Sequence, residues 1–251
     1  MVWTDDQYDS DPRIAALLSK GDPLCEWTVP PGGNYSHDDI DWLTALAADI
    51  HLFEEGEDSK WAAPIHAWHI LAHFPASDGI PPLLNVFATS WDTSMDWNDW
   101  RSEELTTILS LFGEAAIGPL TGFLLEHSHP MWGRGAAGET LKKIAMRYPE
   151  LREQCVARIN LVLQDYEEND IQLNALLICF LMDLDGVEAI ETIRRAFNAE
   201  RVDRKATGTL MAVEIELGTH EKMCRIDTAA LFGTGSRLME PLGTDPPESS
   251  E

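Results

Sequence analysis

The fold of this chain is decided by the stretch WAAPIHAWHILAHF (residues 61–74), followed by PASDG (75–79) and IPPLLNVF (80–87). Apolar residues at positions 61, 65, 68, 71 and 72 recur with the 3.6-residue period of a helix that has one buried face. The PASDG segment predicts a break, with Ser77 or Asp78 as the N-cap of a second helix. Two short helices joined by a tight turn form an αα-hairpin, which needs further hairpins stacked beside it to bury its apolar face.

The rest of the chain supplies those hairpins. Segments that begin near residues 64, 102, 134 and 171 follow one another at intervals of 38, 32 and 37 residues. Intervals of roughly 30 to 45 residues are typical of helical-hairpin repeats of the HEAT type. The sequence therefore predicts an all-α fold, an α-solenoid or superhelix of HEAT-like hairpins. Helices are expected over residues 36–51, 102–112, 114–125, 132–147, 149–164, 170–182, 186–197 and 203–217.

Three parts of the chain are distinguished by composition. Residues 1–60 are expected to form an acidic N-terminal helical arm packed on or next to the repeats, and residues 61–218 form the repeat domain. Residues 219–251 are a C-terminal extension, and its tail from about residue 241 is predicted to be disordered because it is rich in proline, serine and acids.

Charge is the strongest compositional signal. The 251 residues contain 43 acids and 18 bases, for a net charge of −25, and residues 1–130 carry −18 of it. A negative field repels nucleic-acid phosphate and anionic lipid, so direct binding to nucleic acid or membrane is not expected. The same field attracts a partner protein with a basic surface, or provides solubility in a saline environment.

The sequence predicts a soluble, cytoplasmic protein without a cofactor. No apolar run reaches the roughly 18 to 20 residues that span a bilayer, and the N-terminal MVWTDD is acidic where a secretory signal is basic and then apolar. The four cysteines, at positions 25, 155, 179 and 224, lack the close spacing of a zinc site. Cys155 and Cys179 lie among helical apolar residues and are expected to be buried thiols.

Several short segments follow one another along the chain in an order that is typical of a known family. They are LAHF (71–74) with IPPLL (80–84), SEELTTIL (102–109), RGAAGETL (134–141), and AF (196–197) with VD (202–203). In this order they resemble an uncharacterised bacterial domain-of-unknown-function family with HEAT-like helical hairpins, over about residues 61–204. The resemblance implies the helical fold and no particular activity. Many members continue into a small cysteine-rich zinc module, and nothing in this sequence matches it.

A segment rich in tryptophan and aspartate is the main candidate binding site. It lies between two expected helices and contains Trp91, Asp92, Asp96, Trp97, Asp99 and Trp100. Exposed tryptophan is enriched among binding hot spots, and flanking acids steer basic partners. The alternative is that the indole rings fill gaps between repeats.

Three histidines form a candidate metal site. His66, His69 and His73 lie at steps of three and four beside the apolar face of the expected helix, a spacing at which imidazoles share a metal ion. The alternative is three partly exposed histidines that pack on neighbouring loops. His127 and His129, in an expected loop, would complete a metal site, respond to pH, or only shape the turn.

Basic residues concentrate in the third repeat. Arg134, Lys142, Lys143, Arg147, Arg152 and Arg158 either dock an acidic segment or form a solvated face balanced by acids. No phosphate-binding loop, nucleophile motif or recognisable pair of catalytic carboxylates is present in the sequence.

Three functions follow as hypotheses. The first is a non-enzymatic protein-binding protein, an adaptor, assembly factor or inhibitor, that uses a concave surface and the acidic Trp-rich loop. The second is an acidic mimic of nucleic acid that blocks a basic groove on its partner. The third is a metal- or ligand-binding enzyme or lyase-like chaperone, by analogy with other helical-repeat proteins.

Overall fold

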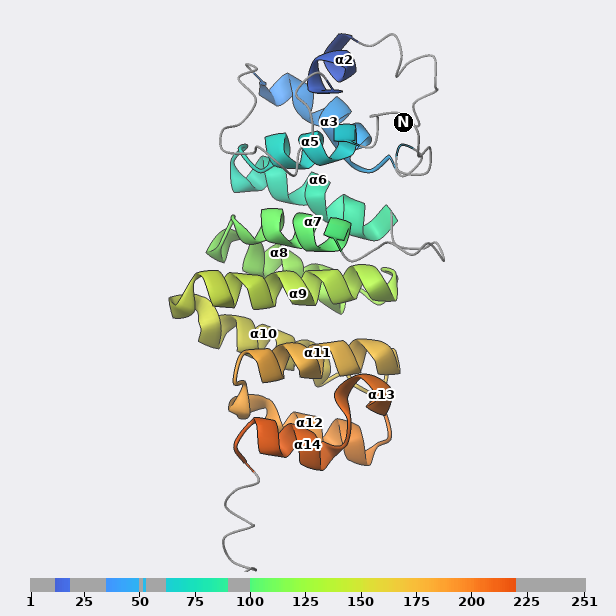
Figure 1. Ribbon diagram of the computed structural model, residues 1–251, viewed down its shortest axis with the longest axis vertical. Helices are drawn as coiled ribbons and strands as arrows, with labels where there is room; N and C mark the ends of the chain where they lie inside the picture. The colour runs from blue at the N-terminus through green and yellow to red at the C-terminus, as the bar shows by residue number, and fades with distance from the viewer. Residues whose placement is uncertain (1–11, 19–34, 50–51, 53–61, 90–99, 220–251) are drawn as a thin grey trace, which may run out of the picture.

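The computed structural model describes residues 12–18, 35–49, 52, 62–89 and 100–219, and every regular element within these ranges is a helix (Figure 1). The α-helices, and the short 3₁₀ helices labelled η, are α2 (Pro12–Leu18), η1 (His37–Asp39), α3 (Ile40–Ala47), α5 (Ala62–Leu71), α6 (Ala76–Thr89), α7 (Trp100–Ser110), α8 (Glu114–Leu125), α9 (Met131–Arg147), η3 (Pro149–Leu151), α10 (Arg152–Leu163), α11 (Ile171–Asp183), η4 (Val187–Ala189), α12 (Ile190–Asn198), α13 (Arg204–Thr207) and α14 (Leu210–Glu216). The prediction of an all-α helical-repeat fold is confirmed.

Helical hairpins stack along one long axis in two layers (Figure 1). The first layer holds α5, α7, α9, α11 and α13, each in contact with the next, and α6, α8, α10 and α12 form the second layer in the same way. Helix α14 packs against α12. One apolar core runs through the stack from Ile14 to Leu217. Helices α2 and α3 pack on α5, where the indole of Trp68 donates a 2.9 Å hydrogen bond to the carbonyl of Ala47. The described part of the N-terminal region therefore shares the core of the repeats.

Helix α9 is the centre of the stack and contacts α6, α7, α8, α10 and α11. Glycines on α9 allow these helices to approach closely. A Cβ added at Gly133 would lie 2.3 Å from the carbonyl oxygen of Phe87, and one added at Gly138 would lie 3.1 Å from the ring of Phe180. Larger side chains at these positions would push α6 and α11 away, because a packed interior has no room for an extra methyl group.

Polar side chains connect successive repeats at one edge of the stack. At this edge each second-layer helix ends and the next first-layer helix begins. The buried guanidinium of Arg134 donates from Nε to the carbonyl of Leu124 and from Nη2 to Oδ1 of Asn169, both at 2.7 Å. Asn174 is the fourth residue of α11, as Arg134 is of α9, and its amide donates to the carbonyl of Arg201 at 2.8 Å. The same helical position thus links one repeat to the next twice along the stack.

The opposite edge carries its own braces. Arg152 donates from Nε to the carbonyl of Leu184 at 2.7 Å and forms a 2.9 Å ion pair with Glu188. Tyr148 donates its hydroxyl to the carbonyl of Leu111 at 3.2 Å. Both side chains therefore join loops of successive repeats.

The basic residues of the third repeat do not form the single solvated face that the sequence allowed. Lys142 pairs with Asp183 of α11 at 3.0 Å, whereas Lys143 donates to the hydroxyl of Thr107 on α7 at 2.8 Å. Together with the bracing roles of Arg134 and Arg152, these contacts hold neighbouring helices in place.

Three predicted helix boundaries are wrong. The helix expected over residues 36–51 ends at Ala47. Helix α6 begins at Ala76, so Gly79 lies inside it rather than in a break. Only glycine fits at this position, because a Cβ there would lie 2.4 Å from the carbonyl oxygen of Leu71. The single helix expected over residues 203–217 is divided into α13 and α14. Gly208, at φ +77°, separates them, since this backbone conformation is outside the helical region.

The close approach of α6 to α9 gives a stability prediction. Replacing Gly133 by Ala should lower the free energy of unfolding by about 1–3 kcal/mol, because the new methyl group collides with the backbone of Phe87. Gly118 of α8 is the matched control, since its Cβ would meet nothing within 4 Å. Gly118→Ala should leave stability unchanged or raise it by up to about 1 kcal/mol. Urea unfolding followed by circular dichroism measures both, and equal effects of the two variants would contradict the packing described for α9.

Candidate functional site

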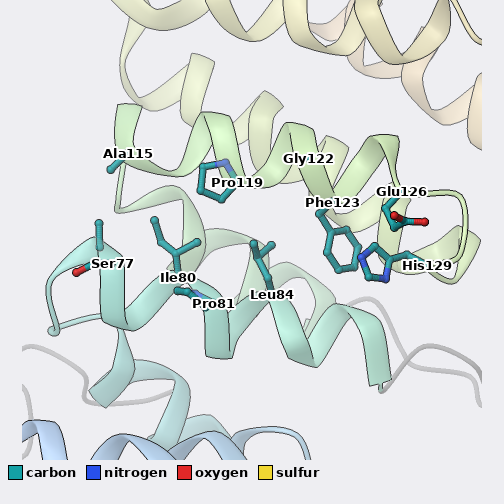
Figure 2. A pocket seen from close by; sticks show the side chains of 11 residues that line it. Ser77, Ile80, Pro81, Leu84, Ala115, Pro119, Gly122, Phe123, Glu126 and His129 are labelled. Carbon is teal, nitrogen blue, oxygen red and sulfur yellow. The ribbon is translucent and has the colours of Figure 1, made fainter.

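A groove of about 530 Å³ lies between α6 and α8, in the second layer (Figure 2). The side chains of Ile80, Pro81 and Leu84 approach it from α6, and those of Pro119 and Phe123 from α8. The lining is mostly apolar and consists of Ala76, Ser77, Ile80, Pro81, Leu84, Ala115, Pro119, Gly122, Phe123, Glu126 and His129.

Short side chains create this hollow. Ala76 and Ala115 face it at one end, and a Cβ added at Gly122 would meet nothing within 4 Å. The rings of Pro81 and Pro119 are compact and do not reach across to the opposite helix (Figure 2). Leu83 of α6 and Leu120 of α8 are fully buried, whereas the outer part of the interface between the two helices is open.

The groove ends at polar residues. The ring of His129 stacks on Phe123 with centroids 3.8 Å apart and an interplanar angle of 8°. Glu126 accepts hydrogen bonds from the hydroxyl and the backbone N–H of Ser128, at 2.8 and 3.1 Å, and these bonds lower the pKa of Glu126. A carboxylate that stays ionised therefore marks this end of the groove.

The surroundings of the groove are negative. Residues 61–130, which supply both of its helices, contain 8 acids and 1 base. Helix α6 carries Asp78 and α8 carries Glu114, and neither helix contains a lysine or arginine. The groove therefore combines an apolar floor with an acidic surround.

A second, polar cleft of about 690 Å³ lies beyond His129, where the loops that follow α8, α10 and α12 meet. His127 and Asp165 join two of these loops through a 2.8 Å hydrogen bond. The cleft is lined by His127, His129, Met131, Arg134, Glu168, Asn169, Asp170 and Arg201.

The predicted Trp and Asp binding site lies almost entirely outside the described residues. Trp91, Asp92, Asp96, Trp97 and Asp99 fall in the range 90–99, and Trp100 begins α7 without a described side chain. The flanking residue Thr89 ends α6, one of the two groove helices. The segment is thus attached directly to the groove helix.

The three predicted metal-binding histidines lie in different surroundings. His66 is buried, with 1% of its surface exposed, so the expectation that it lies beside the apolar face is wrong. Nε2 of His69 lies 2.8 Å from a carboxylate oxygen of Glu104 on α7. His73 is exposed, with Nδ1 2.8 Å from the carbonyl oxygen of His69. Among the residues that the structure describes, no three His, Cys, Asp or Glu side chains are grouped to hold a metal ion.

The described cysteines are not activated as nucleophiles. Cys155 is fully buried, and burial raises the pKa of its thiol to about 11. Burial also raises the pKa of Cys179. A thiol with a raised pKa remains protonated near neutral pH and is a poor nucleophile.

Sequence reasoning did not identify the groove, although signals for it are present. Pro81, Pro119 and Gly122 are exposed residues that disfavour helix formation, yet each lies within a helix. Trp132 was also not singled out; it is 53% exposed in the first turn of α9. An exposed tryptophan is a common anchor in protein interfaces.

These features define an α-helical repeat protein with a groove on its second layer. The chain belongs to the family described as "Protein of unknown function (DUF1186)", whose model matches residues 44–227. The predicted resemblance to an uncharacterised family is thereby confirmed, over a longer range than residues 61–204. Searches of curated proteins and of solved structures found no match. In the described ranges, no helix combines the length and apolar character needed to cross a membrane.

The position of the polar cleft depends on Arg134, and this gives a second stability prediction. Arg134→Lys should lower the free energy of unfolding by about 1–3 kcal/mol, because one ammonium cannot reproduce the two bonds to Leu124 and Asn169 in a buried site. Arg147→Lys, an exposed position on the same helix, should change it by less than about 0.5 kcal/mol. Urea unfolding of both variants measures the difference, and an unchanged stability of Arg134→Lys would show that the brace is dispensable.

Proposed function

We propose that this protein is a non-enzymatic helical-repeat protein that binds a segment of another protein, as an adaptor, assembly factor or inhibitor. The α6/α8 groove is the observation that supports this proposal most. It is apolar along most of its length and about 530 Å³ in volume, which suits a few consecutive side chains of a partner. Burial of those side chains against Ile80, Leu84 and Phe123 would provide the main favourable free energy of binding.

The proposed partner segment carries apolar side chains flanked by lysine or arginine. No lysine or arginine lines the groove, and Glu126 lies at one end of it. The net charge of −25 would steer a basic partner towards the protein and repel nucleic acid and anionic membranes. The proposed location is the cytoplasm, whose reducing conditions suit the free thiols of Cys155 and Cys179.

The Trp and Asp segment is proposed as a second contact with the same partner. It follows Thr89 directly, and the nearby carbonyl of Phe87 lies against Gly133 at the start of α9. The segment is therefore attached at the edge that also carries the 126–130 loop and the exposed Trp132. Its acids match the basic flanks proposed for the partner.

Filling the groove tests the proposal. The tagged protein and two variants would be used to recover partners from the native cell at low and moderate salt, with mass spectrometry of the products. Gly122→Arg places a long, positive side chain in the groove, whereas Gly118→Arg adds the same side chain to the same helix outside the lining. Neither new Cβ meets an atom within 4 Å, so both variants should fold.

We expect one dominant partner, in near-equal amount, with Gly118→Arg and with the unmodified protein. Gly122→Arg should weaken the binding of that partner by roughly tenfold or more, measured by calorimetry with purified components. Equal affinities of the two variants would contradict the groove as the binding site. A partner whose binding surface is acidic would contradict the proposed chemistry.

The Trp segment is tested separately. Replacing Trp91 and Trp97 by Ala should weaken binding of the same partner by roughly tenfold, because tryptophan side chains contribute strongly to protein interfaces. Circular dichroism of the double variant checks that the fold is retained. Unchanged affinity would show that this segment is not part of the interface. The groove would then be tested by the Gly122→Arg and Gly118→Arg variants alone.

A further inference from the structure

The polar cleft beside the groove holds two arginines whose hydrogen-bond partners are all neutral. Arg134 binds the carbonyl of Leu124 and the side-chain oxygen of Asn169. Arg201 binds the carbonyls of Tyr166 and Asn169, at 3.3 and 2.7 Å. In the part of the chain that the structure describes, neither guanidinium forms an ion pair, and Nη1 of each makes no hydrogen bond. Asn169 therefore accepts hydrogen bonds from both guanidinium groups, and among the described residues neither group is paired directly with a carboxylate.

Two carboxylates that act on Arg134 from outside the lining of the cleft already have hydrogen-bond partners of their own. Asp165 and Glu126 lie close enough to favour the charged form of Arg134, yet burial is the larger effect and lowers the pKa of Arg134. Asp165 is bound to His127 at 2.8 Å, and Glu126 accepts its hydrogen bonds from Ser128. With only 4% of Arg134 exposed, its charge is costly to bury unless an anion compensates it.

We propose that this cleft binds the carboxylate of a ligand between Arg134 and Arg201. Guanidinium groups donate paired hydrogen bonds that match a planar carboxylate. The volume of about 690 Å³ is sufficient for such a group together with several neighbouring atoms. This site is independent of the α6/α8 groove, although His129 lines both cavities.

The remaining lining residues select among oxyanions. Glu168 and Asp170 also face the cleft, and both repel a doubly charged phosphate more strongly than a singly charged carboxylate. Asp170 accepts a 2.7 Å hydrogen bond from the backbone of Gln172, whereas Glu168 has no ion-pair partner among the described residues. The ligand therefore carries a cationic group near its carboxylate, placed to meet Glu168.

Nα-acetyl-L-lysine is a suitable probe because it has a carboxylate, an ammonium and no net charge. Its C-terminal amide is the matched control ligand, which keeps the ammonium and lacks the carboxylate. Titrations would follow the arginine Nε–Hε resonances of the full chain by NMR at constant ionic strength. Arg152, paired with Glu188 at the opposite edge, serves as an internal reference.

We expect saturable shifts of the Arg134 and Arg201 resonances with the acid, and binding of the amide and of inorganic phosphate that is weaker by roughly tenfold or more. Arg201→Gln should weaken binding of the acid by a similar factor, whereas the exposed Arg158→Gln should not change it. Equal binding of acid and amide, or shifts as large at Arg152, would overturn the carboxylate site. Phosphate binding as tight as that of the acid would overturn the selection by Glu168 and Asp170. These outcomes require no partner protein, so they are separate from the fate of the proposed function.

Discussion

The buried guanidinium of Arg134 connects the stability of the stack with the shape of its surface. It reaches back to the end of α8 and forward to Asn169 before α11, so that three successive repeats share one set of hydrogen bonds. Asn169 in turn accepts from Arg201, which extends the network to the loop after α12. Helical hairpins have little contact beyond their neighbours, so such bridges set the spacing between repeats. The polar cleft lies where these bridges cross.

The groove has a complementary origin. Helix α9 packs tightly because glycines such as Gly133 let its neighbours approach, whereas α6 and α8 remain apart at their outer edge because Ala115, Pro119 and Gly122 do not fill the space. Small residues therefore have opposite effects at the two interfaces. Where they face a neighbouring backbone, the helices pack closely, and where they face solvent, a groove remains. The acidic composition of residues 61–130 then determines which partner chemistry such an opening suits.

The sequence predicted the repeat architecture because apolar periodicity and interval length are local properties of the chain. It failed where the outcome depends on stacking. His66 was expected beside the apolar face but is enclosed by the packing around α5, and Gly79 was taken for a break although α6 continues through it. The roles of Arg134 and Lys143 were also missed, because their partners lie 35 and 36 residues away in the chain. The groove could not be predicted from periodicity, because it forms where the side chains between two helices are too short to fill the space.

The central claim is that a partner segment occupies the α6/α8 groove. Hydrogen–deuterium exchange of the protein, with and without its purified partner, tests it most directly because it reports protection along the whole chain. The account predicts new protection in α6, α8 and the 126–130 loop, with little change in α12 and α14. Protection confined to α12 and α14, with α6 and α8 unchanged, would contradict it.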